Sequence, residues 1–304
     1  MRSGFAGVVG RPNVGKSTLV NRMVGAKVSI VSARPNTTRH GVRGVLHRPG
    51  AQIVLVDTPG LHRPRTALGE RLVGTAEASL EDVDVAVAVL DATQPIGPGD
   101  RLVLTRALAA SRKAAGSGEG GAAEHAAGRL LVALNKVDRS RPAQLLAQLA
   151  RASEVVEELG GGAGTEYFCV SARTGEGVDE LVEAVVERLP DGPGYFPADV
   201  VSDMPDALWV AELVREQLLR RAREELPHSI ACRVTEWEWP RVRCEIFVER
   251  ESQKGIVIGR GGAVLKEVGT AVRKQLPEGA YLELRVRVEK GWQRRTDALD
   301  RLGY

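Results

Sequence analysis

The segment Gly10-Arg-Pro-Asn-Val-Gly-Lys-Ser17 restricts the fold of this chain more than any other feature. It matches the pattern G-x-x-x-x-G-K-[ST], and it lies between an apolar run, Phe5–Val9, and a helix-like stretch that begins at Ser17. Glycines let a backbone curve closely around an oxyanion, and the N–H groups at a helix start point toward its charge. We therefore predict a phosphate-binding loop between a strand and a helix. The competing interpretation is an ordinary turn between these two elements.

The first 190 residues alternate between strand-like and helix-like stretches. This alternation predicts an α/β fold in which helices cover both faces of a mostly parallel, doubly wound sheet. Val42–Leu46 and Gln52–Asp57 are close enough in sequence to form a hairpin, so we expect one antiparallel strand. Ligands of such sheets bind at the carboxyl ends of the strands, where the phosphate loop lies.

The distribution of prolines and glycines predicts two domains. Residues 1–189 form the first, and residues 190–205, with prolines at 190, 193, 197 and 205, form a linker. Residues 206–304 form a second, small α+β domain. Ala115–Gly128 is rich in alanine and glycine, which predicts a flexible surface loop.

A second motif, Asp57-Thr-Pro-Gly60, follows the apolar strand Ile53–Val56. A carboxylate at this strand end can hold a water molecule on Mg²⁺, and the N–H of Gly60 can contact a γ-phosphate. Lys16 would then reach the β- and γ-phosphates, and the Ser17 hydroxyl would ligate Mg²⁺. Taken alone, D-x-x-G is only a turn, but the preceding strand and the distance from Lys16 favour the nucleotide role.

A third motif, Asn135-Lys-Val-Asp138, indicates which base is bound. The Asp138 carboxylate can accept hydrogen bonds from N1–H and the exocyclic amine of guanine, and adenine lacks this pair of donors. Asn135 would tie this loop to the phosphate loop, and the Lys136 stem would cover the base. Ser171-Ala172 ends the next strand, and the Ala172 N–H would meet the guanine carbonyl oxygen. A turn that caps a helix remains the alternative for Asn135–Asp138.

These segments, in this order, resemble the GTPase family that contains Era, Der and the tRNA-modification GTPase. The resemblance implies GTP or GDP and Mg²⁺ as ligands, and hydrolysis of GTP. Thr37-Thr-Arg39 resembles the family's effector loop, which implies that Thr38 joins Ser17 and Asp57 at Mg²⁺. The residues assigned to the nucleotide are Gly10, Arg11, Pro12, Asn13, Val14, Gly15, Lys16, Ser17, Thr18, Asp57, Thr58, Pro59, Gly60, Leu61, Asn135, Lys136, Val137, Asp138, Ser171 and Ala172.

Leu61 occupies the position where small signalling GTPases carry a glutamine that orients water. A leucine side chain cannot orient water, so hydrolysis must be arranged in another way. The family resemblance implies slow turnover that is stimulated by K⁺, with the ion held near Asn13. Asn13, Lys16, Thr38 and Gly60 are the expected catalytic residues, and the competing account treats Asn13 as an ordinary turn residue.

The last hundred residues predict the element order αββααβ, with Gly259-Arg-Gly-Gly262 between two helices. This pattern resembles the type II KH domain, whose G-x-x-G turn contacts a nucleic-acid backbone and holds about four unpaired nucleotides. The resemblance implies RNA contacts by Ile258, Gly259, Arg260, Gly261, Gly262 and Lys266. The segment Lys254–Lys274 carries five basic residues and one acidic residue, which favours a polyanionic partner. Trp237, Trp239 and Trp292 are assigned to core or linker contacts rather than to RNA.

A G domain followed by one KH domain resembles the Era branch of the family over nearly the whole chain. The resemblance implies binding of the 3′ end of small-subunit ribosomal RNA, a role in small-subunit maturation, a cytoplasmic location and peripheral association with the membrane. We expect a monomer. Two alternatives stay open: an RNA-binding adaptor in which GTP is structural, and a GTPase switch with a protein partner.

The bulk composition is consistent with a protein of the cytosol. Three widely spaced cysteines form no disulfide framework and no metal-binding pattern. No apolar run approaches the roughly 20 residues that span a bilayer, and no export signal opens the chain. The net charge is +3, and its distribution is more informative than its total, because the basic excess lies after residue 205.

Overall fold

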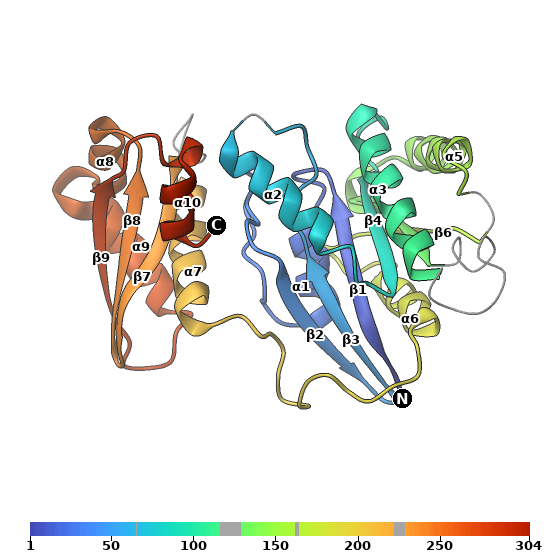
Figure 1. The fold of residues 1–304 in the computed structure, drawn as a ribbon, viewed down its shortest axis with the longest axis horizontal. Helices are drawn as coiled ribbons and strands as arrows, with labels where there is room; N and C mark the ends of the chain where they lie inside the picture. Colours follow the sequence, from blue (N-terminus) through green and yellow to red (C-terminus); the bar gives the residue numbers. More distant parts are fainter. Residues whose placement is uncertain (65, 116–128, 162–163, 222–228) are drawn as a thin grey trace. The chain divides into compact units, whose positions relative to one another are not determined.

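The computed structural model describes residues 1–64, 66–115, 129–161, 164–221 and 229–304 (Figure 1). These residues divide into two compact units. The first unit comprises Met1–Ser29, Thr38–Arg63 and Leu72–Asp203, and the second comprises Ile30–Thr37, Pro64–Arg71 and Met204–Tyr304. Most of the segment expected to be a flexible loop, from residue 116 to residue 128, lies outside the described residues.

The first unit is built on a six-stranded sheet with the order β2-β3-β1-β4-β5-β6. All neighbouring strands are parallel except β2 and β3, which form the expected antiparallel hairpin. The central strands are uniformly buried, as expected for a parallel sheet with both faces covered. The strands are β1 (Arg2–Gly10), β2 (Val42–Arg48), β3 (Ala51–Asp57), β4 (Val85–Asp91), β5 (Leu130–Asn135) and β6 (Glu166–Val170).

Helices cover both faces of this sheet, which confirms the predicted α/β architecture. One core cluster joins the sheet to α1 and α6, through residues such as Leu19 and Leu181. A second cluster on the other face includes Leu104 of α3 and Val155 of α5. The helices are α1 (Lys16–Val24), α2 (Ala67–Ala78), α3 (Pro98–Ala115), α5 (Pro142–Glu158) and α6 (Val178–Arg188).

The proline-rich segment after α6 runs along the first unit. Gln52 of β3 receives hydrogen bonds from the N–H groups of Tyr195 and Phe196, at 2.6 and 3.0 Å. The ring of Tyr195 packs edge-on against Phe5, with ring centroids 4.9 Å apart. Farther along, the Val45 N–H donates to the Val201 carbonyl oxygen at 2.8 Å. Specific contacts therefore hold this segment against β1, β2 and β3.

The second unit contains the predicted order of elements around a three-stranded sheet, β7-β8-β9. Strands β7 and β8 are antiparallel and β8 and β9 are parallel. The elements are α7 (Asp206–Arg221), β7 (Ala231–Glu238), β8 (Arg241–Val248), α8 (Glu251–Ile258), α9 (Ala263–Arg273), β9 (Tyr281–Val288) and α10 (Thr296–Leu302). Residues 222–228, between α7 and β7, lie outside the described part of the chain.

Two features of the second unit differ from the sequence-based expectations. The chain ends in α10, a helix that was not predicted, because its seven residues give too short a periodic pattern. Trp292 is fully buried, as expected, and its Nε1 donates to the Ser229 carbonyl oxygen at 3.1 Å. In contrast, Trp237 and Trp239 are 40% and 48% exposed, so their assignment to core or linker contacts was wrong.

Within the described residues, the helices are all too short or too polar to cross a bilayer.

Candidate nucleotide site and nucleic-acid interface

The four motifs of the first unit lie together at one edge of the sheet. Strands β1, β3, β5 and β6 end at Gly10, Asp57, Asn135 and Val170. Strands β3, β5 and β6 run in the same direction as β1 in this sheet. Their carboxyl ends and that of β1 therefore meet at one edge. The tertiary structure therefore brings together the segments Gly10–Thr18, Asp57–Leu61, Asn135–Asp138 and Ser171–Ala172, which are far apart in the sequence.

The phosphate loop is packed so closely that its glycines cannot be replaced. Gly15 has a φ of 101°, and a Cβ at this position would lie 2.3 Å from Nδ2 of Asn135. At Gly60, a Cβ would lie 2.7 Å from the backbone nitrogen of Pro12. Real side chains do not make contacts this short, so the backbone of each motif closes directly on its neighbour. This close approach is what a loop that wraps a phosphate requires.

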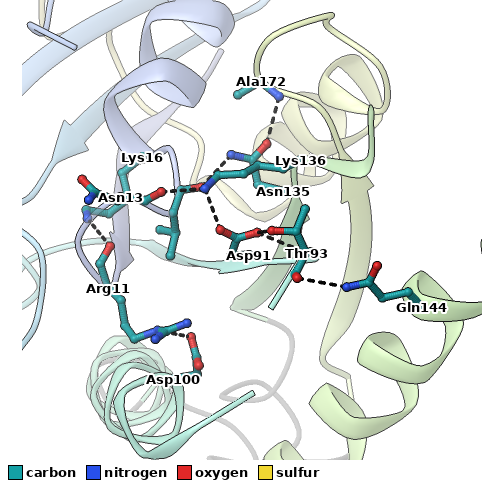
Figure 2. Close-up of polar contacts among 11 residues, drawn as sticks. Arg11, Asn13, Lys16, Asp91, Thr93, Asp100, Asn135, Lys136, Gln144 and Ala172 are labelled. Carbon is teal, nitrogen blue, oxygen red and sulfur yellow. Dashed lines mark hydrogen bonds and ion pairs between the residues drawn. The ribbon is translucent and has the colours of Figure 1, made fainter. Parts of the chain in front are cut away.

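Lys16 lies inside the phosphate loop. Its Nζ donates to the carbonyl oxygens of Gly10 and Arg11, at 3.1 and 3.0 Å (Figure 2). Burial lowers the pKa of Lys16 to about 8, and the Asp57 carboxylate opposes part of this shift. A polyphosphate beside this ammonium would favour its charged form. The lysine is therefore placed to contact the phosphates of a nucleotide.

Three oxygen-bearing side chains at the loop form a cluster suited to Mg²⁺. The hydroxyls of Ser17 and Thr38 are 2.8 Å apart, and the Thr38 hydroxyl donates to Oδ2 of Asp57 at 3.2 Å. Burial raises the pKa of Asp57, while nearby Lys16 acts in the opposite direction. Its Oδ1 is buried and has no hydrogen-bond partner among the described residues. Hard oxygen ligands with an unsatisfied carboxylate oxygen fit Mg²⁺ held together with a phosphate.

Asn135 connects the phosphate loop to the loop after β6. Its Nδ2 donates to the Val14 carbonyl oxygen at 2.8 Å, and its Oδ1 accepts from the Ala172 N–H at 2.9 Å (Figure 2). This arrangement is the tie that the sequence predicted. The contact of the Ala172 N–H with a guanine carbonyl stays a prediction, because this N–H is bonded to Asn135 here.

Asp138 is held in one orientation next to these loops. Its Oδ1 accepts a hydrogen bond from the Ser171 hydroxyl at 2.8 Å, and its side chain is 15% exposed. Arg173 lies 4.0 Å from the other carboxylate oxygen. A carboxylate oriented in this way can accept two donors from a planar base.

The structure adds Asp91, which the sequence analysis missed, to the site. Lys136 Nζ donates to Oδ2 of Asp91 at 2.6 Å and to the Asn13 carbonyl oxygen at 2.7 Å (Figure 2). Burial acts to raise the pKa of Asp91, but hydrogen bonds from Lys136 and Thr93 outweigh it and lower the pKa. Asp91 therefore fixes Lys136 over the phosphate loop. Its position at the carboxyl end of an apolar strand is visible in the sequence, but that position alone does not show its contact with Lys136.

We expect Asp91→Asn to weaken nucleotide binding without unfolding the site, because the amide keeps the shape but loses the charge that holds Lys136. A charge-assisted hydrogen bond contributes on the order of 1.5 kcal/mol, which predicts GDP dissociation about tenfold faster. Stopped-flow measurement with a fluorescent GDP analogue tests this. Asp84→Asn is the matched control, since Asp84 accepts the Phe5 N–H at the start of β1; equal dissociation rates for the two variants would contradict the role of Asp91.

A second unpredicted contact holds Arg11 of the phosphate loop. Its Nε donates to Oδ1 of Asp100 at 2.7 Å, and Oδ2 of Asp100 accepts the Gly97 N–H at 2.9 Å (Figure 2). Asp100 is almost fully buried, so it presents a fixed anchor at the start of α3. This ion pair directs the Arg11 side chain toward α3.

Leu61 is buried in the core and does not orient a water molecule. Its side chain is 1% exposed and belongs to the core cluster that contains Val9, and its N–H donates to the Gly10 carbonyl oxygen at 3.1 Å. The structure thus agrees with the inference that this residue does not orient the attacking water. Thr58 is likewise structural, because its hydroxyl donates to the Val8 carbonyl oxygen at 2.9 Å.

The predicted RNA-contacting turn joins α8 to α9 in the second unit. Gly259, Gly261 and Gly262 have φ values of 74°, 59° and 81°, which other residues rarely adopt. Arg260 and Lys266 are exposed, and Ile258 is half-buried. A Cβ on Gly259 would lie 2.9 Å from the backbone nitrogen of Val264, whereas none of the described atoms lies within 4 Å of a Cβ on Gly261 or Gly262. The turn therefore leaves room for a backbone from another molecule to approach.

Comparison with known families supports both parts of the site. Residues 5–115 match the family model described as "50S ribosome-binding GTPase". Residues 225–293 match the KH domain model.

Full-length relatives carry the same pair of domains. The chain is 45% identical over 314 residues to GTPase Era of Mycobacterium tuberculosis (strain H37Rv), covering 99% of this chain and 98% of the relative. The Era protein of Mycobacterium sp. (strain KMS) is 44% identical, with 100% and 99% covered.

Two solved structures match the whole chain with a TM-score of 0.87. One is an Aquifex aeolicus Era variant bound to GDP and AlF₄⁻, 35% identical, with 100% of this chain and 99% of that chain covered. The other is Era in complex with MgGDPNP and nucleotides 1506–1542 of 16S ribosomal RNA, 36% identical with the same coverage. The phosphate loop, the guanine-type loops, the G-x-x-G turn and this full-length similarity lead to one conclusion: the chain belongs to the Era family of GTPases.

Proposed function

We propose that this protein is a GTP-hydrolysing switch that binds the 3′ end of small-subunit ribosomal RNA and assists maturation of the small ribosomal subunit. The observation that carries the proposal is the presence of a guanine-nucleotide site and a G-x-x-G turn in one chain. A full-length relative in complex with MgGDPNP and a 16S RNA fragment supports it.

In this proposal, the phosphate loop and Lys16 hold the β- and γ-phosphates, and Asp138 selects guanine. Ser17 and Thr38 would ligate Mg²⁺ directly, and Asp57 would do so through water. Mg²⁺ supplies charge neutralisation at the phosphates when it is bound. The N–H of Gly60 would contact the γ-phosphate. Arg11, Pro12, Val14, Thr18, Thr58, Pro59 and Val137 form the surrounding backbone of the same loops.

We also infer that K⁺ near Asn13 stimulates hydrolysis. Asn13 has a φ of 66° and an exposed side chain, and Lys136 already occupies its carbonyl oxygen. Its carboxamide oxygen is therefore the group that would contact a cation. Because Leu61 cannot orient water, a cation near Asn13 would supply electrostatic stabilisation in addition to that from Lys16 and Mg²⁺.

GTP hydrolysis should be at least about tenfold faster in KCl than in NaCl. This factor is smaller than the roughly 10²–10³-fold rate effect of a single oxyanion-hole donor. The variant Asn13→Gly should lose this difference and retain GDP affinity, because glycine keeps the positive φ of this position and removes only the carboxamide. Multiple-turnover phosphate release in matched salts measures the rate. Equal rates in the two salts for the parent protein would remove K⁺ from the mechanism.

The switch segment offers a physical link between nucleotide and RNA. Thr38 contacts the Mg²⁺ ligands Ser17 and Asp57. Its neighbour Thr37 belongs to the second unit, where the buried Arg215 of α7 donates to its carbonyl oxygen. Adjacent residues of one loop are thus held by the nucleotide site and by the RNA-binding unit.

The decisive experiment measures RNA affinity in the presence of a GTP analogue and of GDP. The substrate is an unpaired oligonucleotide with the 3′-terminal sequence of small-subunit RNA. We expect different affinities in the two states, and we expect Arg260→Glu to weaken binding about tenfold or more through loss of a phosphate contact. Lys290→Glu, an equal charge reversal at an exposed position after β9, is the control. Unchanged RNA affinity in Arg260→Glu would favour a protein partner instead, and failure of single-turnover GTP hydrolysis would favour the adaptor.

The remaining parts of the proposal come from the family resemblance. We propose a G domain at residues 1–189, a connecting segment at 190–205 and a KH domain at 206–304. The contacts of Gln52 with Tyr195 and Phe196 support a connecting segment that packs against β3. We also infer a monomer in the cytoplasm that associates peripherally with the membrane. The three cysteines are free thiols, which fits a reducing compartment.

A further inference from the structure

A basic groove lies between α7 and α9 of the second unit. It encloses about 490 Å³. Arg220 and Arg221 line it from α7, and Lys266 and Lys274 line it from α9 and its C-terminal cap. Glu267 is the acidic residue among the lining side chains, and it pairs with Arg221 at 3.3 Å. Four cationic groups and one carboxylate give the groove a strong positive charge.

These cationic groups are available to a ligand. Arg220 contacts the buried Glu216 carboxylate at 3.3 Å, yet its own side chain remains 52% exposed. Lys266 and Lys274 are exposed, and neither forms an ion pair with any side chain in the described part of the chain. The groove is therefore not a self-neutralised network of surface ion pairs.

An aromatic pocket continues the groove. It encloses about 470 Å³ and is lined by Trp209, Trp237, Trp239 and Leu276. Trp237 and Trp239 are stacked, with ring centroids 6.4 Å apart and planes inclined by 30°. Gln275 lines both the groove and the pocket, so the two are contiguous. Figure 1 shows the elements α7, α9 and β7 that build this surface lying side by side.

The strand geometry explains why the two indoles reach the surface. The pairing of β7 with β8 shifts between Val234 and Glu236, which is the mark of a β-bulge. A bulge turns the side chains that follow it on the strand, such as Trp237, and Trp239 lies in the turn between β7 and β8. The exposure of two tryptophans to water is energetically unfavourable for a domain that binds no ligand at this surface.

Cations along a groove and exposed aromatic rings at its end are the two elements that bind single-stranded nucleic acid. An acidic peptide would use the cations but would leave the stacked indoles without a partner. Lys266 lies one helical turn after Gly262, and Lys274 lies roughly 12 Å farther along the helix axis at 1.5 Å per residue. The groove is therefore continuous with the turn that is proposed to hold RNA.

We infer that the α7–α9 groove is a second RNA-binding surface. Phosphates of an unpaired strand that continues beyond the G-x-x-G turn lie along Arg220, Lys266 and Lys274, and its bases stack on Trp237 and Trp239. This inference rests on the proposed RNA-binding function and extends the footprint beyond the nucleotides held at the turn.

The test uses the full chain and two unstructured RNA oligonucleotides, of four and of twelve nucleotides. The variants are Arg220→Ala with Lys274→Ala for the groove, Trp237→Ala with Trp239→Ala for the pocket, and Lys290→Ala as the control. Each pair of changes should leave four-nucleotide binding unchanged and weaken twelve-nucleotide binding about tenfold or more, since stacking alone contributes this much per base. The groove variant should also lower the slope of log K against log salt by about 1.4, from two phosphate contacts.

The outcomes separate this inference from the function on which it rests. If Arg260→Glu weakens both oligonucleotides while the groove and pocket variants bind the longer one like the parent, only the second surface is wrong. If the parent binds neither oligonucleotide, the RNA function itself fails. If the groove variant loses binding of polyglutamate but not of RNA, the groove takes an acidic protein and the inference is overturned.

Discussion

Asp138→Asn should abolish the preference of this protein for guanine nucleotides. In the proposed site the carboxylate would accept two donors from the base, and each hydrogen bond to a charged group contributes about 1.5–3 kcal/mol. We therefore expect GDP to bind about 10²–10⁴-fold more weakly and to lose most of its advantage over ADP. Competition binding with fluorescent GDP at equilibrium measures both effects.

The design of this variant separates recognition from folding. An asparagine at 138 still accepts the Ser171 hydroxyl through its amide oxygen, so the loop keeps its geometry. The new amide N–H₂ faces the base, and it should favour a nucleotide whose exocyclic amine is replaced by a carbonyl group. Xanthosine diphosphate should therefore bind the variant better than GDP does. Asp179→Asn, the same change at a side chain that is 82% exposed, should leave all of these affinities unaltered.

Arg215→Ala should destabilise the second unit by about 3–5 kcal/mol, because it leaves the buried Glu212 carboxylate without its ion pair. The Arg215 side chain is fully buried, and its Nε donates to Oε1 of Glu212 at 2.9 Å. All four tryptophans of the chain lie after residue 203, so fluorescence during urea unfolding reports on this unit alone.

Two further variants make this stability prediction specific. Replacing both partners, with Arg215→Met and Glu212→Leu, should cost far less than the single change, since no charge is left buried. Arg301→Ala removes an arginine that is 54% exposed and pairs with Asp297, itself 56% exposed, and should cost less than about 1 kcal/mol. A loss of under 1 kcal/mol in Arg215→Ala would show that the Glu212 carboxylate is solvated or protonated without its partner.

The arrangement of the nucleotide motifs could be read from the chain because each follows a strand. Once the apolar runs before Asp57 and Asn135 are taken as strands parallel to β1 in one sheet, topology alone brings their carboxyl ends to the same edge. The G-x-x-G turn could be predicted from the sequence equally well, because its glycines adopt backbone angles that few other residues can.

The roles of Asp91 and Asp100 could not be predicted from the sequence in this way. An isolated aspartate after a strand or at a helix start has many common roles, such as capping. Only the fold shows that Asp91 lies beside Lys136 and that Asp100 lies beside Arg11. The exposed tryptophans are a similar case, because a strand pattern does not reveal the register shift that precedes Trp237 or the exposure of Trp237 and Trp239.

The sequence by itself determined the α/β class of the first domain, the KH-type order of the second, and the loops that would meet a nucleotide and an RNA. These properties depend on local backbone chemistry and on the order of the strands, which are written along the chain. The tertiary structure alone decided which charged groups pair across the site, and which helices and indoles form the α7–α9 groove. Such contacts join residues of separate elements, and their formation depends on the packing of side chains that no local pattern records.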